Sequence, residues 1–121
     1  MQNEKTTVLT ALQTASAITT IVSARIYFLY PPDFAILPSI SYFELSNIGN
    51  LYADNQEIGS EIIYQIDSWS KASLSALALA IDDVMTGIDF TRIQSIDLFE
   101  NDSRIHHKSM RYKINKSDPD F

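Results

Sequence analysis

The chain contains no cysteine among its 121 residues and only three glycines. The absence of cysteine excludes disulfide bonds, a catalytic thiolate and any zinc site that depends on Cys ligands. The scarcity of glycine excludes the usual glycine-rich loops that hold phosphate groups, and no serine lies in a G-x-S-x-G context. These absences remove several enzyme classes, and we expect a protein with neither a catalytic site nor a cofactor.

Long apolar runs are missing as well. The longest weakly polar segment, residues 72–81, is far shorter than the roughly 20 apolar residues that a membrane-spanning helix requires. The N-terminus contains an acid, Glu4, and lacks the basic region followed by an apolar block that marks a secretory signal. We therefore expect a protein that is made in the cytoplasm and remains there.

Cations are absent from a large part of the chain. Between Ile26 and Ser70 there is no Lys or Arg, whereas residues 104–116 contain several cations and no acid. The net charge of −6 argues against a general nucleic-acid-binding protein, because such proteins gather Lys and Arg to neutralise phosphates. The sequence thus predicts one acidic part and one basic part. The acids of the first segment are Asp33, Glu44, Asp54, Glu57, Glu61 and Asp67, and the cations of the second are Arg104, Lys108, Arg111, Lys113 and Lys116.

Two segments have apolar residues at the three- and four-residue spacings of a helix. The first helix is expected to begin near Asn3 or Thr6, and the second to follow a serine cap at Ser68 or Ser70 and to stop at Gly87. The apolar residues of the first stripe are Val8, Ala11, Leu12, Ala15, Ile18 and Val22, and those of the second are Leu74, Leu77, Ala78, Ile81, Met85 and Ile88.

Five segments are rich in β-branched and aromatic residues and predict strands. They are residues 25–30, 39–47, 61–69, 92–99 and 105–114. In the second strand, Phe43 and Leu45 face opposite to Ile40 and Tyr42, which indicates either burial on both faces or a bulge. The polar segment 48–59 predicts a long hairpin loop, which is either a binding segment or a tolerated surface insertion.

The predicted order is α-β-β-β-α-β-β, an α+β domain with two helices on one face of a mostly antiparallel sheet. We expect this single domain to cover residues 1–115 and residues 116–121 to form a flexible tail. The strand that ends at Trp69 passes almost directly into the second helix, so this corner is the predicted centre of the fold. Trp69 either anchors the corner in the core or is exposed to a partner. The expected core residues are Ile62, Ile66, Leu74, Leu77 and Ile81.

One group of residues could suggest a metal or acid/base site. His106 and His107 lie near Asp102, and imidazole both titrates near neutral pH and binds transition metals. Adjacent residues of a strand point to opposite faces, however, so the two histidines should not converge on one ion. We therefore expect no metal site. The Asp82-Asp83 pair, opposite the apolar stripe of its helix, is most simply a solvated face.

Several segments together resemble the tail-completion proteins of long-tailed bacteriophages and prophages. They are the N-terminal helix, RIYFLYPP, LPSISYFELS, the QIDSWSK corner and the hairpin LFENDSRIHHKSMRYKI, and the resemblance covers roughly residues 5–115. It implies a structural assembly protein that completes the head-proximal end of the tail tube and joins it to the head connector, commonly as a hexameric ring. The implied partners are the tail-tube protein, the head-connector protein and other copies of the chain, with no specific nucleic acid and no membrane.

This resemblance places the protein at the tail-to-head junction of the virion, and in the host cytoplasm during assembly. A ring joins different patches of neighbouring copies, and separate acidic and basic surfaces suit such contacts. The alternative is a small α+β binding or regulatory module unrelated to phage assembly. The candidate contact residues are Asn50, Asp54, Asn55, Glu57 and Glu61 on the acidic side and Arg111 and Lys113 on the basic side.

Overall fold

The computed structural model describes residues 2–53 and 56–117. In these ranges the chain forms three helices and one five-stranded sheet with the strand order β1-β2-β3-β5-β4. β1 is parallel to β2, and the other neighbouring strands are antiparallel. The elements are α1 (Lys5–Thr14), α2 (Ser16–Val22), β1 (Ile26–Phe28), β2 (Ser39–Ala53), β3 (Gln56–Ser70), α3 (Ser75–Gly87), β4 (Thr91–Glu100) and β5 (Ile105–Ser117).

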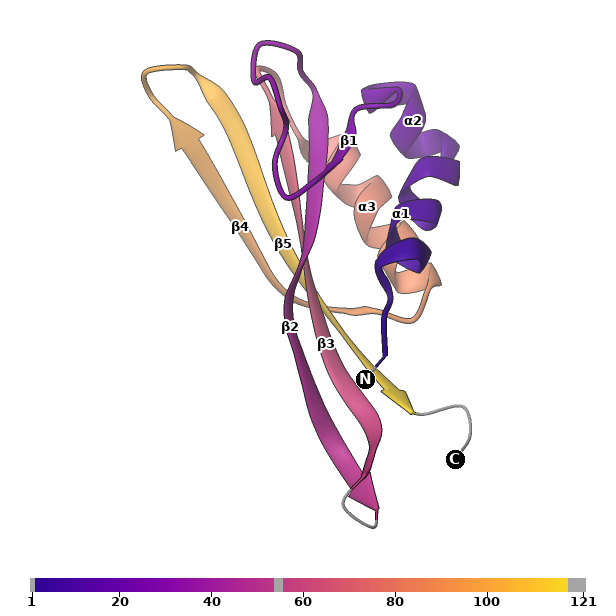
Figure 1. The fold of residues 1–121 in the computed structure, drawn as a ribbon. Coiled ribbons are helices and arrows are strands. Elements are labelled where there is room, and N and C mark those ends of the chain that lie inside the picture. Colours follow the sequence, from indigo (N-terminus) through magenta and orange to yellow (C-terminus); the bar gives the residue numbers. More distant parts are fainter. Residues whose placement is uncertain (1, 54–55, 118–121) are drawn as a thin grey trace.

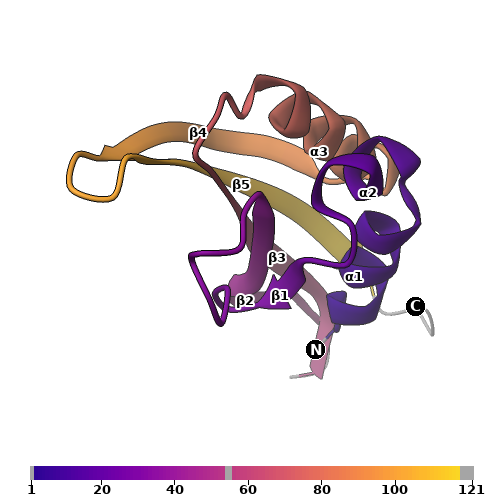
Figure 2. The same ribbon diagram turned by 90° about the horizontal axis from the view of Figure 1, so that it is seen from above.

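All three helices lie on one face of the sheet, and the other face is left without a helix (Figures 1 and 2). The predicted α+β class and the helices on one face are therefore confirmed. The number of helices differs, because the chain turns to an extended conformation at Ala15 (ψ 111°) and divides the expected first helix into α1 and α2. The division keeps the apolar stripe in the core, since Val8, Leu12, Ile18 and Val22 are all fully buried.

The core fills the space between the helices and the covered face of the sheet. Ile62, Tyr64 and Ile66 of β3 are at most 1% exposed, and they face the apolar stripe of α3. Full burial of a side chain of this size contributes about 1.5–3 kcal/mol. The five expected core residues are all buried. They are joined by Met110, Tyr112 and Ile114 of β5.

The prediction of a long loop at residues 48–59 is wrong. β2 continues to Ala53 and β3 begins at Gln56, so nearly the whole segment belongs to an extended hairpin. Its glycines and polar residues fit a twisted ribbon because the pairing shifts register between Gly49 and Leu51 and again between Leu51 and Tyr52. The first shift in this pair lies between Glu44 and Ser46, so the bulge alternative for Leu45 is the correct one.

Two hairpins extend toward opposite ends of the molecule (Figure 1). The β2–β3 hairpin ends at one side, and the β4–β5 hairpin, which turns at residues 101–104, ends at the other. β5 continues through Ser117, two residues into the segment that the sequence assigned to a flexible tail, and residues 118–121 lie outside the described residues. None of the helices in the described part of the chain is long and apolar enough to cross a bilayer.

Candidate assembly surfaces

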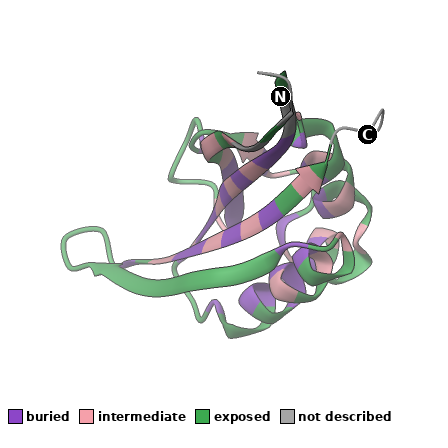
Figure 3. Cartoon of the chain, turned by 90° about the horizontal axis from the view of Figure 1, so that it is seen from below, coloured by how far each residue is buried: buried purple, intermediate pink, exposed green. Residues whose placement is uncertain are grey.

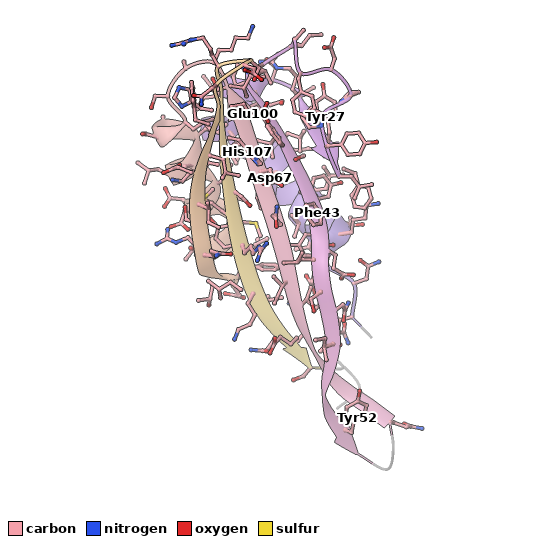
Figure 4. The ribbon with its side chains drawn as sticks, turned by 90° about the vertical axis from the view of Figure 1, so that its left-hand side faces the viewer. Tyr27, Phe43, Tyr52, Asp67, Glu100 and His107 are labelled. Carbon is pink, nitrogen blue, oxygen red and sulfur yellow. The ribbon has the colours of Figure 1, made fainter. Side chains whose placement is uncertain are left out.

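The face of the sheet without helices, here called the open face, contains a polar cluster on its inner strands β3 and β5 (Figure 4). Asp67 of β3 accepts a hydrogen bond of 2.8 Å at Oδ1 from His107 Nε2 of β5, since an ionised carboxylate can only accept. Gln65 Nε2 donates to both Asp67 oxygens at 3.2 and 3.0 Å, and Arg111 Nε donates to Gln65 Oε1 at 3.1 Å. The side chain of Asp67 is 5% exposed and that of His107 is 15% exposed, so this network is a fixed part of the sheet.

Sequence reasoning missed this network because its members are about 40 positions apart in the chain. The signal that could have found it is the register of β3 against β5, in which Asp67 is opposite Ser109 and Trp69 is opposite His107. His106, by contrast, contacts Phe99 at 4.8 Å between ring centroids. The two histidines therefore have separate surroundings, as the alternation of a strand predicts. Among the described residues, no three His, Asp or Glu side chains gather where they could hold a metal ion.

Trp69 lies on the open face rather than in the core beneath the helices. Its ring stacks on His107 with 3.6 Å between centroids and an interplanar angle of 14°, and Phe34 approaches it edge-on at 4.9 Å. Trp69 Nε1 also donates to Ser41 Oγ at 3.3 Å. Trp69 is half-buried, and it fixes the loop that contains Phe34 to the sheet. Of the two alternatives that the sequence left open, burial in the core beneath the helices is not the one observed.

The acidic and basic segments are neighbours in one sheet. β3, from the cation-free part of the chain, pairs along its length with β5, which carries most of the late cations. Arg111 is opposite Gln65, and Lys113 is opposite Ile63. Lys113 is half-buried and has no charged partner among the described residues, whereas Lys108 and Lys116 approach Asp97 and Glu4 at 3.0 and 3.9 Å. The charges predicted to form two separate surfaces therefore meet within each copy.

The acidic contact candidates that the structure describes lie in the β2–β3 hairpin. Asn50 lies in β2, and Glu57 and Glu61 lie in β3, where Glu61 is half-buried and opposite Ile48. Asp54 and Asn55 fall outside the described residues, as do the side chains of Asn50 and Glu57. Ile48 and Tyr52 in the same hairpin are 59% and 61% exposed. The hairpin thus presents apolar side chains beside the half-buried Glu61.

Asp82 takes part in structure rather than forming a solvated face with Asp83. It accepts a hydrogen bond of 2.9 Å from the hydroxyl of Tyr112 and pairs with Arg92 at 3.1 Å, which ties α3 to β5 and β4. Burial raises the pKa of Tyr112, and the hydrogen bond to Asp82 raises it further. Burial, together with the nearby Glu44 carboxylate, raises the pKa of Tyr64 to about 12. Both phenols therefore stay neutral well above neutral pH.

β4 is the least covered element of the molecule. Every one of its residues is exposed, although it contains four large apolar side chains (Figure 3). A shallow hollow of about 390 Å³ lies between α3 and the β4–β5 hairpin, lined by Leu79, Asp82, Arg92 and Lys108 among others. The exposed apolar residues of β4 are Ile93, Ile96, Leu98 and Phe99.

Comparisons with known proteins agree with this architecture. The model of a family described as "Tail completion protein gp17" matches residues 6–115. Among solved structures, the chain is similar to one described as "Virion of native gene transfer agent (GTA) particle", with a TM-score of 0.65 and 12% sequence identity, over 90% of this chain and 92% of that chain. At this identity the likeness establishes the fold. A search of curated proteins found no match.

Proposed function

The chain belongs to the gp17 family of tail completion proteins, and we propose that it closes the head-proximal end of a phage tail tube and joins that end to the head connector. The observation that carries this proposal is the family match, which spans nearly the whole domain. The role is structural, in the assembly of the tail, rather than catalytic. The proposed site of action is the tail-to-head junction of the virion, with assembly in the host cytoplasm.

The proposed assembled form is a ring of six copies that contacts the tail-tube protein on one side and the connector on the other. A ring is built by a contact between two different patches, repeated around an axis until it closes. A chain that is monomeric in isolation is compatible with this form, because partners present at the tail end can stabilise the ring by mass action.

Arg111 and Lys113 are the proposed cationic side of one contact between copies. Arg111 is held in place by Gln65, and Lys113 has no charged partner among the described residues. Both lie in β5 and share the open face. The proposed acidic side is the hairpin segment from Asp54 to Glu61 of the next copy. Exchange of both cations for Glu should reduce joining, and normal joining by the double variant would remove this pairing.

The tip of the β2–β3 hairpin is the second proposed contact. Deletion of residues 50–55 with a two-residue turn in their place should leave the core intact, because the buried part of β3 begins after this segment. We expect the shortened protein to fold and to join tails to heads poorly. Joining at the level of the unaltered protein would instead show that the tip is a spacer.

Electron microscopy of tails tests the whole proposal. Tails assembled with the protein should end in a capped tube and join filled heads, whereas tails made without it should have an altered head-proximal end and remain free. Addition of purified protein to the free tails should restore joining. If tails made without the protein have the same ends and join heads normally, the assignment is wrong.

A further inference from the structure

The sheet has two edges that lack a partner strand over most of their length. β4 is the last strand on one side, and no strand in the described part of the chain pairs with its outer edge. On the other side, β1 covers only Ile40 to Tyr42 of β2, and the last bond runs from Leu29 N to Tyr42 O at 2.9 Å. From Phe43 onward, β2 has no described partner on that side.

Both edges carry exposed apolar side chains, which a protein that acts alone usually avoids. Monomeric proteins protect sheet edges with charges, prolines or very short strands, because an open edge invites pairing with another chain. β4 is ten residues long and contains Ile96 and Leu98, which are 38% and 49% exposed. The free part of β2 contains Leu45 and Ile48, which are 41% and 59% exposed.

Three exposed apolar residues of the two edges, Ile96, Leu98 and Ile48, lie on the same face. Ile96 is opposite Ser109 and Leu98 is opposite His107, so both belong to the open face. Ile48 is opposite Glu61, which alternates with the buried Ile62 and therefore also belongs to the open face. Strands from two copies that paired at these edges would place these three apolar side chains together on one continuous face.

The directions of the strands fit a ring. Along β2, β3, β5 and β4 each neighbour is antiparallel to the one before, so β4 runs opposite to β2. Rotation about a ring axis does not change the direction of a strand along that axis. β4 of one copy would therefore meet β2 of the next in the antiparallel sense, which gives the slightly more stable ladder, at every joint of the ring.

The regular parts of the two edges, and the charges beside them, are compatible with antiparallel pairing of β4 in one copy with β2 in the next. Between their bulges, β4 is regular over residues 94–100 and β2 over residues 46–49. Antiparallel pairing of these parts brings the start of β4 toward the far end of β2. Arg111 and Lys113 flank the start of β4, and Glu61 lies beside the free part of β2 on the same face. The charges across this joint would then be opposite.

We propose that β4 of each copy pairs with the free edge of β2 in the next copy, so that the sheet continues around the ring. This inference rests on the ring proposed above and names the surface that closes it. The partner is a second copy of this chain, and the affinity comes from main-chain hydrogen bonds together with burial of the two apolar edges.

Disulfide cross-linking can test the pairing cleanly because the natural chain has no cysteine. Ile48→Cys is combined in one chain with Gln94→Cys, Ile96→Cys or Leu98→Cys, and each single variant is made as well. Paired residues in a ladder have Cα atoms about 4.5–5.5 Å apart, within the range of a disulfide. The proteins are oxidised on purified tails that contain them, and the products are separated without reductant.

The proposal predicts a ladder of multimers from at least one double variant and no cross-links from any single variant. Dimers from a single variant would indicate a two-fold contact and would overturn the proposal. Normal incorporation into tails with no cross-link from any double variant would also overturn it, while the proposed function would stand. Absence of the unaltered protein from tail ends would contradict the proposed function itself.

A charge placed on the edge provides a second test that does not depend on oxidation. Ile96→Glu with Leu98→Glu should lower incorporation into tails about tenfold or more, because carboxylates without partners would be buried in the joint. Leu79→Glu is the matched control, since Leu79 is 69% exposed and belongs to α3, on the covered side of the sheet, rather than to either free edge. Circular dichroism checks that the variants fold. Equal incorporation of the edge variant and the control would overturn the proposal.

Discussion

β3 and β4 belong to the same sheet and have similar apolar residues, yet their surroundings are opposite. β3 lies in the middle of the sheet, and its Ile62 and Ile66 are completely buried under the helices. β4 lies at the edge, and its Ile93 and Ile96 are 47% and 38% exposed. A similar alternating sequence thus stabilises the single chain in one strand and remains available to a neighbour in the other.

The difference indicates that apolar residues of one sheet can be buried at two different stages. The first stage is folding, in which β3 and β5 are covered by α1, α2 and α3. The second stage is assembly, in which surface that the single chain leaves open is covered by another chain. Substitutions in the two strands should therefore separate stability from assembly, and the following predictions are ordered from the largest expected effect to the smallest.

Ile66→Ala should destabilise the single chain by about 2–5 kcal/mol, because it leaves a cavity in a core with no solvent access. Urea unfolding followed by circular dichroism measures the change in the free energy of unfolding. Tail joining should fall only as far as the folded fraction falls. A loss below 1 kcal/mol would show that the residues around Ile66 are loosely packed.

Asp67→Ala should cost about 1–3 kcal/mol, because His107 and Gln65 would lose their acceptor in a largely buried site. Asp83→Ala is the matched control, since Asp83 is exposed on α3. The same unfolding measurement applies to both variants. Equal stability of the two would mean that the network on the open face adds nothing to the fold.

Stability should fall as the pH rises above about 10, the ordinary pKa of tyrosine. In the unfolded chain Tyr64 releases its proton at that pH, whereas in the folded chain its pKa is about 12. Between these two pH values the free energy of unfolding therefore decreases, and the decrease at about pH 11 is about 1.4 kcal/mol. Tyr64→Phe should weaken this pH dependence, and Tyr52→Phe, at an exposed position, should not. Identical pH profiles for the two variants would contradict the prediction.

Leu98→Ala should change the stability of the single chain by less than about 0.5 kcal/mol, because Leu98 is half exposed on the edge strand. Leu77→Ala provides the comparison, since Leu77 of α3 is 2% exposed and should cost about 2–5 kcal/mol. Thermal unfolding of the two variants side by side measures the contrast. A comparable loss in both would mean that β4 is already covered in the isolated protein.

Local sequence patterns were sufficient for much of the fold. The stripe from Leu74 to Met85 predicted α3 because its apolar residues recur with the period of a helix, and Gly87 ends the helix as expected. The β-branched and aromatic residues of segment 105–114 predicted the strand β5, in which the alternating Met110, Tyr112 and Ile114 are buried. In these segments a single period is sustained over several turns or alternations, so neighbours in sequence contain the information.

Features that depend on pairing between distant segments could not be predicted in this way. The segment 48–59 has the composition of a loop, but most of it pairs between β2 and β3 as a twisted hairpin with bulges. The contact between His107 and Asp67 follows from the register of β3 against β5, which no local pattern reveals. The break at Ala15 likewise follows from the way that α1 and α2 each pack on the core.

Trp69 is the only tryptophan of the chain, and it stacks on His107 on the open face, near the end of β3. The intrinsic fluorescence of the protein at tryptophan wavelengths therefore originates from one defined place, between β3, β5 and the loop that contains Phe34. The molecule carries its own spectroscopic label on the face that lies between the two free edges. Changes in emission when copies meet each other or a tail would report directly on that face, without any attached dye.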